Sequence, residues 1–336
     1  MFKRIVVTFF FLSLILIPYH NTYSWGVWGH QHINRAAVFA LPMPMRTFFF
    51  DHIDFITIEA SIPDVRKYGF NDRNEAPRHF IDLEAYGDHP FDVLPETWDS
   101  AKAKYGTKGL DKNGILPWYI PDMLNKLTEA FRDQDKVRIL FFAADLAHYI
   151  GDAYVPLHTS LNYDGQLTGQ KGVHALWESL IPELFGKDYN LHTAPAAYIQ
   201  NPVKETWRII HESHDLVQTV LSTDKKLLDT WPEDSIYETD SNGKIVKNKY
   251  HEARFTDNFA KAYSEELHGM EEHQMQLAIQ SVADYWYTAW VDAGKPDLSQ
   301  LDDSYTNKVH RKALKYQYHL WQTKGKLIGI KPEMEY

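Results

Sequence analysis

The chain has 336 residues, of which 44% are hydrophobic and 24% are charged, a composition typical of a globular protein rather than a disordered or fibrous one. Its formal net charge of -10 argues against a protein held on nucleic acid or anionic lipid mainly by overall charge. The sequence has 17 histidines and no cysteine, which excludes disulfides, thiolate metal sites and cysteine nucleophiles. Any metal site must therefore use nitrogen and oxygen ligands.

Residues 1–24 have the features of a secretory signal peptide. Lys3 and Arg4 precede a largely apolar run that ends at Ile17, and Thr22 and Ser24 occupy the small-residue positions before a cleavage site. This apolar run is shorter than the ~20 residues that a membrane-spanning helix needs. We therefore expect an exported protein, periplasmic or secreted, that begins at residue 25 after cleavage and has no transmembrane anchor.

The remainder, residues 25–336, is expected to form one all-α, multi-helix domain. Six segments have apolar residues at intervals of three and four, which is the period of a helix. These segments are 30–41, 119–132, 134–151, 173–184, 203–229 and 255–293. Glycines and prolines predict long surface connections over 84–117 and 230–250, the second with a small hairpin at 241–243. Residues 300–336 carry seven basic and four acidic side chains and are expected to be a solvated face or tail.

One stretch of the chain combines histidines and acids at regular spacing. His148 and Asp152 are four residues apart on a predicted helix, so their side chains project from one face. His158 follows six residues later, and His174 and Glu178 repeat the four-residue spacing on the next predicted helix. Imidazole with carboxylate and no thiolate suits zinc in an open, catalytic site, although other divalent metals accept the same ligands.

A single histidine–acid pair is weak evidence, because such pairs also arise by chance on helix surfaces. His211 and Asp215 have the same spacing without any continuation of the pattern, and we interpret them as a solvated helix pair. The full string H-x3-D-x5-H-x15-H-x3-E is much rarer by chance, and it predicts a metal site.

The motifs resemble those of the zinc-dependent phospholipase C and S1/P1 nuclease superfamily. In the order of that family, the matching segments are Trp25-Gly-Val-Trp-Gly-His30, Ala60-Ser-Ile-Pro-Asp64, Ala76-Pro-Arg-His-Phe-Ile-Asp82, His148-Tyr-Ile-Gly-Asp152, Pro156-Leu-His158 and His174-x3-Glu178. Trp286-Tyr-Thr-Ala-Trp290 is similar to the bacterial phospholipase C branch. The resemblance implies an all-α domain of the phospholipase C/P1 nuclease type.

The resemblance also implies three zinc ions and a set of ligands for each. The ligands of the first ion would be Asp64, His79, His148 and Asp152. Those of the second would be His158, His174 and Glu178. Those of the third would be the α-amino nitrogen and carbonyl oxygen of Trp25, together with His30 and a bridging Asp152.

The activity implied by the resemblance is hydrolysis of a phosphodiester by zinc-bound hydroxide, with Asp64 as general base as well as ligand. Glu178 and the chain pattern from about residue 36 onward favour the phospholipase C branch and a phospholipid substrate. The Trp25–His30 spacing and the interval from Asp64 to the next histidine ligand are those of an S1/P1-type single-strand nuclease, for which no stable nucleic-acid complex is expected. Two other classes remain open: a non-catalytic exported zinc-binding protein, and a structural or carbohydrate-binding protein with one stabilising metal.

Several residues near the motifs have two interpretations. Asp145 could orient a ligand imidazole or pair on the surface, and Arg66 and Arg78 could hold a phosphate or be ordinary surface arginines. His32 and His52 are interpreted as ordinary surface or core histidines. Four aromatic residues could line a substrate cleft, although core packing is the commoner role: Trp118, Tyr119, Tyr163 and Trp177.

Overall fold

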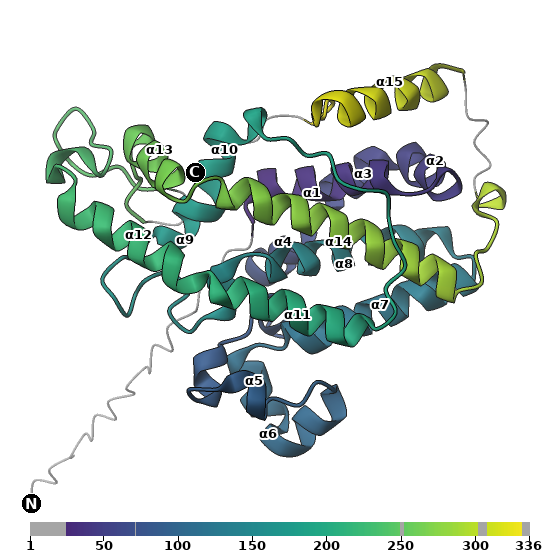
Figure 1. The fold of residues 1–336 in the computed structure, drawn as a ribbon, viewed down its shortest axis with the longest axis horizontal. Helices are drawn as coiled ribbons and strands as arrows, with labels where there is room; N and C mark the ends of the chain where they lie inside the picture. The colour runs from purple at the N-terminus through teal and green to yellow at the C-terminus, as the bar shows by residue number, and fades with distance from the viewer. Residues whose placement is uncertain (1–24, 71, 249–251, 302–307, 331–336) are drawn as a thin grey trace, which may run out of the picture.

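The structure is a computed structural model that describes residues 25–70, 72–248, 252–301 and 308–330. The predicted signal peptide lies outside the described residues. Helices surround the long central helix α14 (Met270–Asp292), as Figure 1 shows. Within the described ranges, extended pairing is limited to three isolated bridges. The prediction of an all-α fold is therefore confirmed.

Eight of the α-helices in the described residues precede residue 155, and the others follow it. The first eight are α1 (Val27–Ala40), α2 (Met43–Asp51), α3 (Ile53–Glu59), α4 (Ile62–Tyr68), α5 (Pro90–Val93), α6 (Trp98–Asn113), α7 (Leu116–Arg132) and α8 (Lys136–Ala153). The later ones, besides α14, are α9 (Val173–Ala175), α10 (Ile181–Phe185), α11 (Pro202–Asp215), α12 (Val217–Thr230), α13 (Asp257–Glu266) and α15 (Lys308–Lys324). The short turns are η1 (Ala76–His79), η2 (Leu83–Tyr86), η3 (Pro156–Thr159), η5 (Gly186–Asp188), η6 (Glu233–Ser235), η7 (Leu298–Gln300) and the π-helical turn η4 (Leu176–Leu180).

Helices α1, α7, α8 and α14 pack against one another and form the centre of the core. α7 starts with a proline at its first turn and buries one apolar face. α8 begins where the side chain of Asp135 accepts a hydrogen bond from the backbone N–H of Arg138, 3.1 Å away. Most of α8 from Ile139 onward is buried. Polar residues on its inner face are therefore held inside the protein.

The predicted helices are present, but two of the long ones are divided. The segment 203–229 is interrupted at Leu216, between α11 and α12. The segment 255–293 is interrupted between α13 and α14, where His268 and Gly269 have φ angles of 54° and 80°. A left-handed backbone conformation ends a right-handed helix, which explains the second break.

The prediction of a long connection over 84–117 is wrong for its second half, which forms α6. Only Ala101 and Leu110 of α6 are buried, and Gly106 bends the helix with a φ of 70°. Such a narrow apolar stripe gives little periodic signal in a sequence. α5 and α6 lie beneath α11 in Figure 1 and extend away from the main body.

The hairpin predicted within 230–250 is present as a bridge between Thr239 and Ile245. The backbone N–H of Asp240 donates to the carbonyl of Lys244 across this turn, over 2.8 Å.

Residues 300–336 were expected to be a solvated face or tail, and residues 308–324 form a largely exposed helix, α15, which fits the first of these alternatives. Trp321 anchors this helix: it is only 2% exposed, and its ring centroid lies 6.0 Å from that of Phe39 on α1. The indole N–H donates to the carbonyl of Leu191 over 2.7 Å. A buried tryptophan with a satisfied N–H fixes the helix to the body of the protein.

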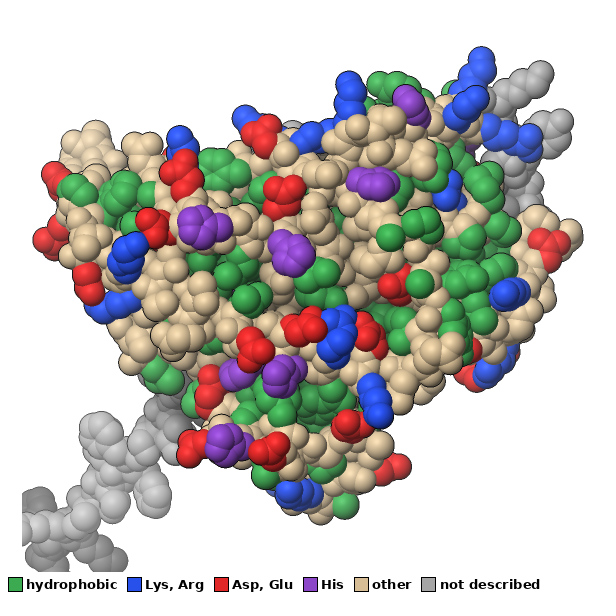
Figure 2. Space-filling model, viewed as in Figure 1, with side chains coloured by type: hydrophobic (Ala, Val, Ile, Leu, Met, Phe, Trp, Pro, Cys, Tyr) green, Lys and Arg blue, Asp and Glu red, His purple; other side chains and the backbone are tan. Residues whose placement is uncertain are grey.

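Acidic and basic side chains are interspersed over the face shown in Figure 2, rather than separated by sign. None of the helices in the described ranges combines the length and the apolar character required to span a bilayer.

Candidate metal centre

The centre is built around α8, which presents His148 and Asp152 one turn apart. Both side chains are fully buried, and His148 Nε2 lies 3.4 Å from Asp152 Oδ2. α8 brings them to the core because the residues around them are apolar and pack on α1, α7 and α14. The predicted helical spacing therefore places an imidazole and a carboxylate side by side.

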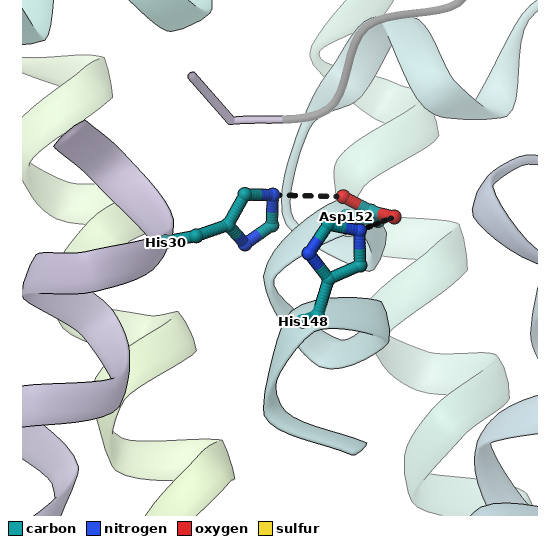
Figure 3. Close-up of side chains that lie close together, drawn as sticks. All are labelled: His30, His148 and Asp152. Atoms are coloured by element: carbon teal, nitrogen blue, oxygen red, sulfur yellow. Dashed lines mark ion pairs between the residues drawn. The ribbon is translucent and has the colours of Figure 1, made fainter. Parts of the chain in front are cut away.

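His30, His148 and Asp152 form the first of three groups whose ligand atoms lie within 4.8 Å of one another. His30 comes from α1, and its Nε2 lies 3.4 Å from Asp152 Oδ1. The rings of His30 and His148 are stacked, with centroids 3.9 Å apart. Figure 3 shows His30 reaching across from its helix to the carboxylate on α8.

Asp64, His79 and His148 form the second group. Asp64 lies in the first turn of α4 and His79 at the end of η1. His79 Nδ1 is 3.6 Å from Asp64 Oδ1 and 2.9 Å from Asp152 Oδ2. The two oxygens of Asp152 thus face different groups, Oδ1 towards His30 and Oδ2 towards His79, which is the arrangement required of a bridging carboxylate.

His158, His174 and Glu178 form the third group. His158 lies on η3, two residues after Pro156. His174 lies on α9 and Glu178 on η4. Glu178 Oε2 is 2.9 Å from His174 Nε2 and 3.6 Å from His158 Nε2. A π-helical turn is unusual and is often found at functional sites.

All eight predicted side-chain ligands are thus brought together in three adjoining groups. The ninth predicted ligand, Trp25, lies beside them: its ring is buried, 4.8 Å from that of Trp177, and packs against Gly29 and Gly151. The backbone N–H of the next residue, Gly26, donates to the carbonyl of Glu178 over 3.2 Å. Coordination by the Trp25 amine and carbonyl stays a prediction.

Backbone carbonyls orient two of the imidazoles from outside the centre. His148 Nδ1 lies 2.7 Å from the carbonyl of Ala60, and His158 Nδ1 lies 2.6 Å from the carbonyl of His79. A carbonyl can only accept, so each Nδ1 carries the proton and each Nε2 presents its lone pair to the centre.

Three histidines of the centre, His30, His79 and His148, favour the neutral form. Burial is the main reason that the pKa values of His30, His79 and His148 lie well below that of an ordinary imidazole, and neighbouring positive groups lower them further. Neutral imidazole is the form that binds metals.

The donor set fits metal ions. Asp152 and Glu178 are fully buried carboxylates, and their imidazole neighbours carry no compensating charge when neutral. Buried charges in proteins are normally paired or coordinate metals. Eight nitrogen and oxygen donors of this kind could hold divalent cations.

Two further residues belong to the centre and were missed at the sequence level. Lys67 is 7% exposed; burial lowers the pKa of its ammonium, while the nearby carboxylates of Asp64, Asp152, Glu178 and Glu75 raise it. Glu75 is fully buried and lies beside His79. Lys67 follows Asp64 by three residues and Glu75 precedes His79 by four, and this helical spacing could have indicated that both lie near the ligands.

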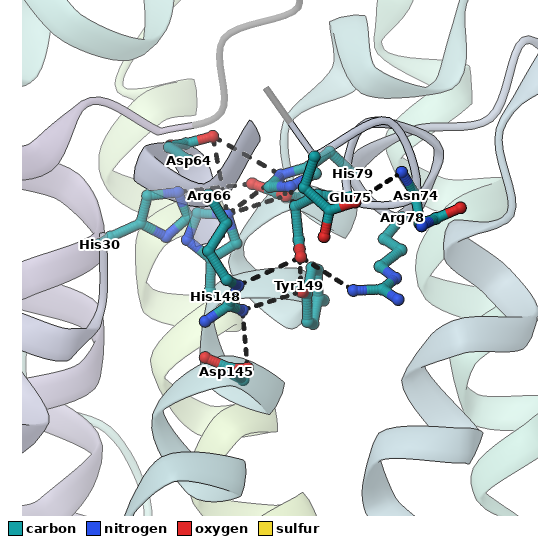
Figure 4. A network of polar contacts seen from close by, with 12 residues as sticks. His30, Asp64, Arg66, Asn74, Glu75, Arg78, His79, Asp145, His148 and Tyr149 are labelled. Atoms are coloured by element: carbon teal, nitrogen blue, oxygen red, sulfur yellow. Dashed lines mark hydrogen bonds and ion pairs between the residues drawn. The ribbon is translucent and has the colours of Figure 1, made fainter. Parts of the chain in front are cut away.

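The hypothesis that Asp145 orients a ligand imidazole is not what the structure shows. Asp145 Oδ2 accepts a hydrogen bond from Arg66 Nη2 over 2.7 Å. Arg66 and Arg78 in turn both donate to Glu75 Oε2, over 3.1 and 2.8 Å. Figure 4 shows Arg66 extending down to Asp145, with Glu75 and Arg78 to the right. Arg66 and Arg78 are thus engaged in ion pairs rather than being isolated surface arginines.

The remaining histidines with predicted roles are ordinary. His32 Nδ1 lies 2.6 Å from the carbonyl of Trp28, and the His52 ring packs on Phe48. His211 and Asp215 form an exposed pair, as predicted, with Nδ1 and Oδ2 3.4 Å apart.

The four aromatic candidates divide between core and cavity. Trp177 is buried against the ring of Trp25, and the Tyr163 ring centroid lies 6.2 Å from that of His174. Trp118 and Tyr119 line a cavity of about 740 Å3. Arg78 also lines this cavity, and its guanidinium lies 4.7 Å from the centre of the Tyr119 ring.

No protein-family model matches the chain, and no curated protein matches it significantly. The expected membership of the phospholipase C and S1/P1 nuclease superfamily therefore rests on the motifs of this sequence.

Proposed function

We propose that the protein is an exported, zinc-dependent hydrolase of phosphodiesters, similar to phospholipase C. The observation that carries the proposal is the gathering of eight histidine, aspartate and glutamate side chains into three groups, the first two of which share His148. Imidazole and carboxylate without thiolate suit catalytic zinc. Closely spaced zinc ions lower the pKa of water towards neutrality and offset charge on a phosphate when they are bound.

The chain's own residues have distinct parts in this proposal. Asp64 is the most exposed of the eight, at 22%, whereas the other seven are buried, so substrate and water reach the centre beside it. Its carboxylate is placed to accept a proton from attacking water, as a general base. Lys67 brings a buried ammonium to the same region, where it can pair with a phosphate oxygen.

A phospholipid is the favoured substrate, because Glu178 matches the phospholipase C branch. Single-stranded nucleic acid is the second candidate, because the Trp25–His30 spacing matches the nuclease branch. Both substrates present a phosphodiester to the same centre.

The first experiment uses zinc-loaded protein beginning at Trp25, given a phosphatidylcholine dispersion and single-stranded DNA in parallel. We expect elemental analysis to find three zinc ions per chain and phosphocholine to be released from the lipid. Nucleotide release with intact lipid would instead assign the protein to the nucleases. Bound zinc without turnover of either substrate, or of bis(p-nitrophenyl) phosphate, would favour a non-catalytic zinc-binding protein.

The variant Asp64→Asn tests the proposed base. Loss of a general base typically costs about 100-fold or more in rate, so we expect kcat on the active substrate to fall by that amount. Zinc content, measured by elemental analysis, shows whether the loss reflects chemistry or a lost ligand. His211→Gln, in an exposed pair, is the matched control. Full activity of Asp64→Asn with full zinc would remove Asp64 from the mechanism.

A further inference from the structure

Glu75 is a fully buried carboxylate just outside the three groups of predicted ligands. Oε2 accepts hydrogen bonds from Arg66 and Arg78. Oε1 accepts one from the hydroxyl of Tyr149 and lies 3.5 Å from His79 Nε2. The two oxygens therefore face different partners: one is occupied by guanidinium groups and the other is directed at a phenol and an imidazole.

Two carboxylates and two guanidinium groups pair within this cluster, and the ammonium of Lys67 also lies near Glu75. Arg66 and Arg78 each carry one positive charge, and Asp145, which pairs with Arg66 over 2.7 Å, supplies the second negative charge. A buried carboxylate needs such partners to remain ionised, because an isolated charge in the protein interior is strongly unfavourable. Figure 4 shows this cluster extending from Asp145 through the guanidinium of Arg66 to Glu75 and His79.

His79 and the imidazoles of His148 and His158 direct different ring nitrogens at the centre. His148 and His158 present Nε2 to the carboxylates and direct Nδ1 at backbone carbonyls. His79 presents Nδ1 to Asp152, over 2.9 Å, whereas its buried Nε2 makes no hydrogen bond within the described residues and lies 3.5 Å from Glu75 Oε1. A neutral imidazole has one N–H, so a proton on Nε2 leaves the Nδ1 lone pair for a metal.

We propose that Glu75 is a positioning residue that holds His79 in the Nε2–H tautomer, so that Nδ1 can bind a zinc ion. This inference rests on the proposed function, since it needs His79 to be a ligand. The proposal thus adds Glu75, four residues before His79, to the motif Ala76-Pro-Arg-His-Phe-Ile-Asp82 that implied His79 as a ligand. A carboxylate partner also makes the ligating imidazole more basic than a carbonyl partner does.

The first test compares zinc affinity of the full protein and of Glu75→Gln by competition with a chromophoric chelator. The substitution keeps the size of the side chain and removes its charge. We expect the weakest-bound ion to lose about tenfold to a hundredfold in affinity, the range observed for partners of metal-binding histidines. Glu205→Gln is the control, because Glu205 pairs with Arg208 three residues away, as Glu75 does with Arg78, but on α11. Equal affinity of Glu75→Gln and Glu205→Gln would overturn the proposal.

A second test keeps Glu75 in place and so does not depend on whether a variant at this position folds. Two-bond 1H–15N correlation spectra of zinc-loaded, 15N-histidine protein report which nitrogen of each imidazole carries the proton. The His79 signals are assigned as those missing from His79→Gln. We expect a proton on Nε2 of His79 and on Nδ1 of His148 and His158. A proton on Nδ1 of His79 would overturn the proposal.

The two proposals fail in different ways. If the protein binds no zinc, the proposed function fails before the role of Glu75 is reached. If it binds zinc and hydrolyses a phosphodiester but Glu75→Gln binds zinc as tightly as Glu205→Gln, only the role of Glu75 is wrong.

Discussion

Gly151 shows how closely single residues are fitted to the centre. It lies on α8 between the two ligands of that helix, and a Cβ at this position would be 3.2 Å from His30 Nδ1 and Cε1. The same Cβ would lie 3.5 Å from the Trp25 ring. A glycine inside a helix costs about 0.5–1 kcal/mol relative to alanine, so this one weakens α8 in order to admit the His30 ring.

We expect Gly151→Ala to separate stability from metal binding. The added methyl group must displace His30 by a few tenths of an ångström, and we expect zinc affinity to fall by about tenfold. The metal-free protein should keep its melting temperature or gain slightly, because alanine is the better helix former. Chelator competition and calorimetry measure the two quantities.

Gly109→Ala on α6 is the control, since its Cβ would meet nothing nearer than Tyr105 Cβ at 4.0 Å. Unchanged zinc affinity in Gly151→Ala would show that His30 has room to move or is not a ligand.

At the scale of elements, the spacing of apolar residues and of the histidine–acid pairs predicted helices and contacts within one helix. Helical periodicity located α1, α7 and α8, and the four-residue interval correctly predicted that His148 lies beside Asp152. Periodicity could not reveal α6, because only two of its residues are buried. Nor could it reveal the break at Gly269, which depends on backbone conformation.

The candidate site was predictable to a similar degree. The eight predicted side-chain ligands come from recognisable motifs, whereas Glu75 and Lys67 matter because of where α4 and η1 place them in three dimensions. The ion pair of Arg66 with Asp145 joins residues 79 positions apart, and no local pattern encodes such a contact.

The start of α14 carries a buried acid with consequences for pH. Glu271 is 1% exposed, and burial raises the pKa of its carboxyl to about 8 from the ordinary 4.5. The folded protein thus keeps a proton that the unfolded chain releases. The contribution of Glu271 to stability must then decrease as pH rises from about 4.5 to about 8 and level off above that.

We therefore expect Glu271→Gln to be more stable than the original protein at pH 8, by up to a few kcal/mol, and little different at pH 4.5. Urea unfolding of both proteins across this range measures the difference. Glu265→Gln, which removes an exposed carboxylate on α13, should change stability by less than about 0.5 kcal/mol at either pH. A constant difference between Glu271→Gln and the original protein at all pH values would contradict the raised pKa.

At the scale of the whole molecule, the centre joins segments that are far apart in the sequence. Its side chains come from α1, α4, η1, α8, η3 and the α9–η4 turn. Without cations, Lys67 is the one ammonium described near the buried carboxylates of Asp152 and Glu178, which is less positive charge than these groups and Asp64 together carry as negative charge. Bound ions would therefore stabilise the packing of the whole domain.

Removal of metal should lower the melting temperature by on the order of 10 °C, because tight binding to the folded state alone contributes several kcal/mol. Calorimetry before and after treatment with a chelator measures the shift. Zinc added back should restore the original value, whereas magnesium, which prefers oxygen ligands, should not. An unchanged melting temperature in metal-free protein would contradict a role for the centre in holding these segments together.

The backbone of His79 has a second consequence for the centre. Its carbonyl is the acceptor for His158 Nδ1, and the carbonyl of His158 accepts in return from the N–H of Ile81 over 2.8 Å. A displacement of η1 is therefore transmitted to η3 through these two hydrogen bonds, and from there to the donors around Glu178. A disturbance at Asp145 would in this way reach His158, at the opposite end of the centre.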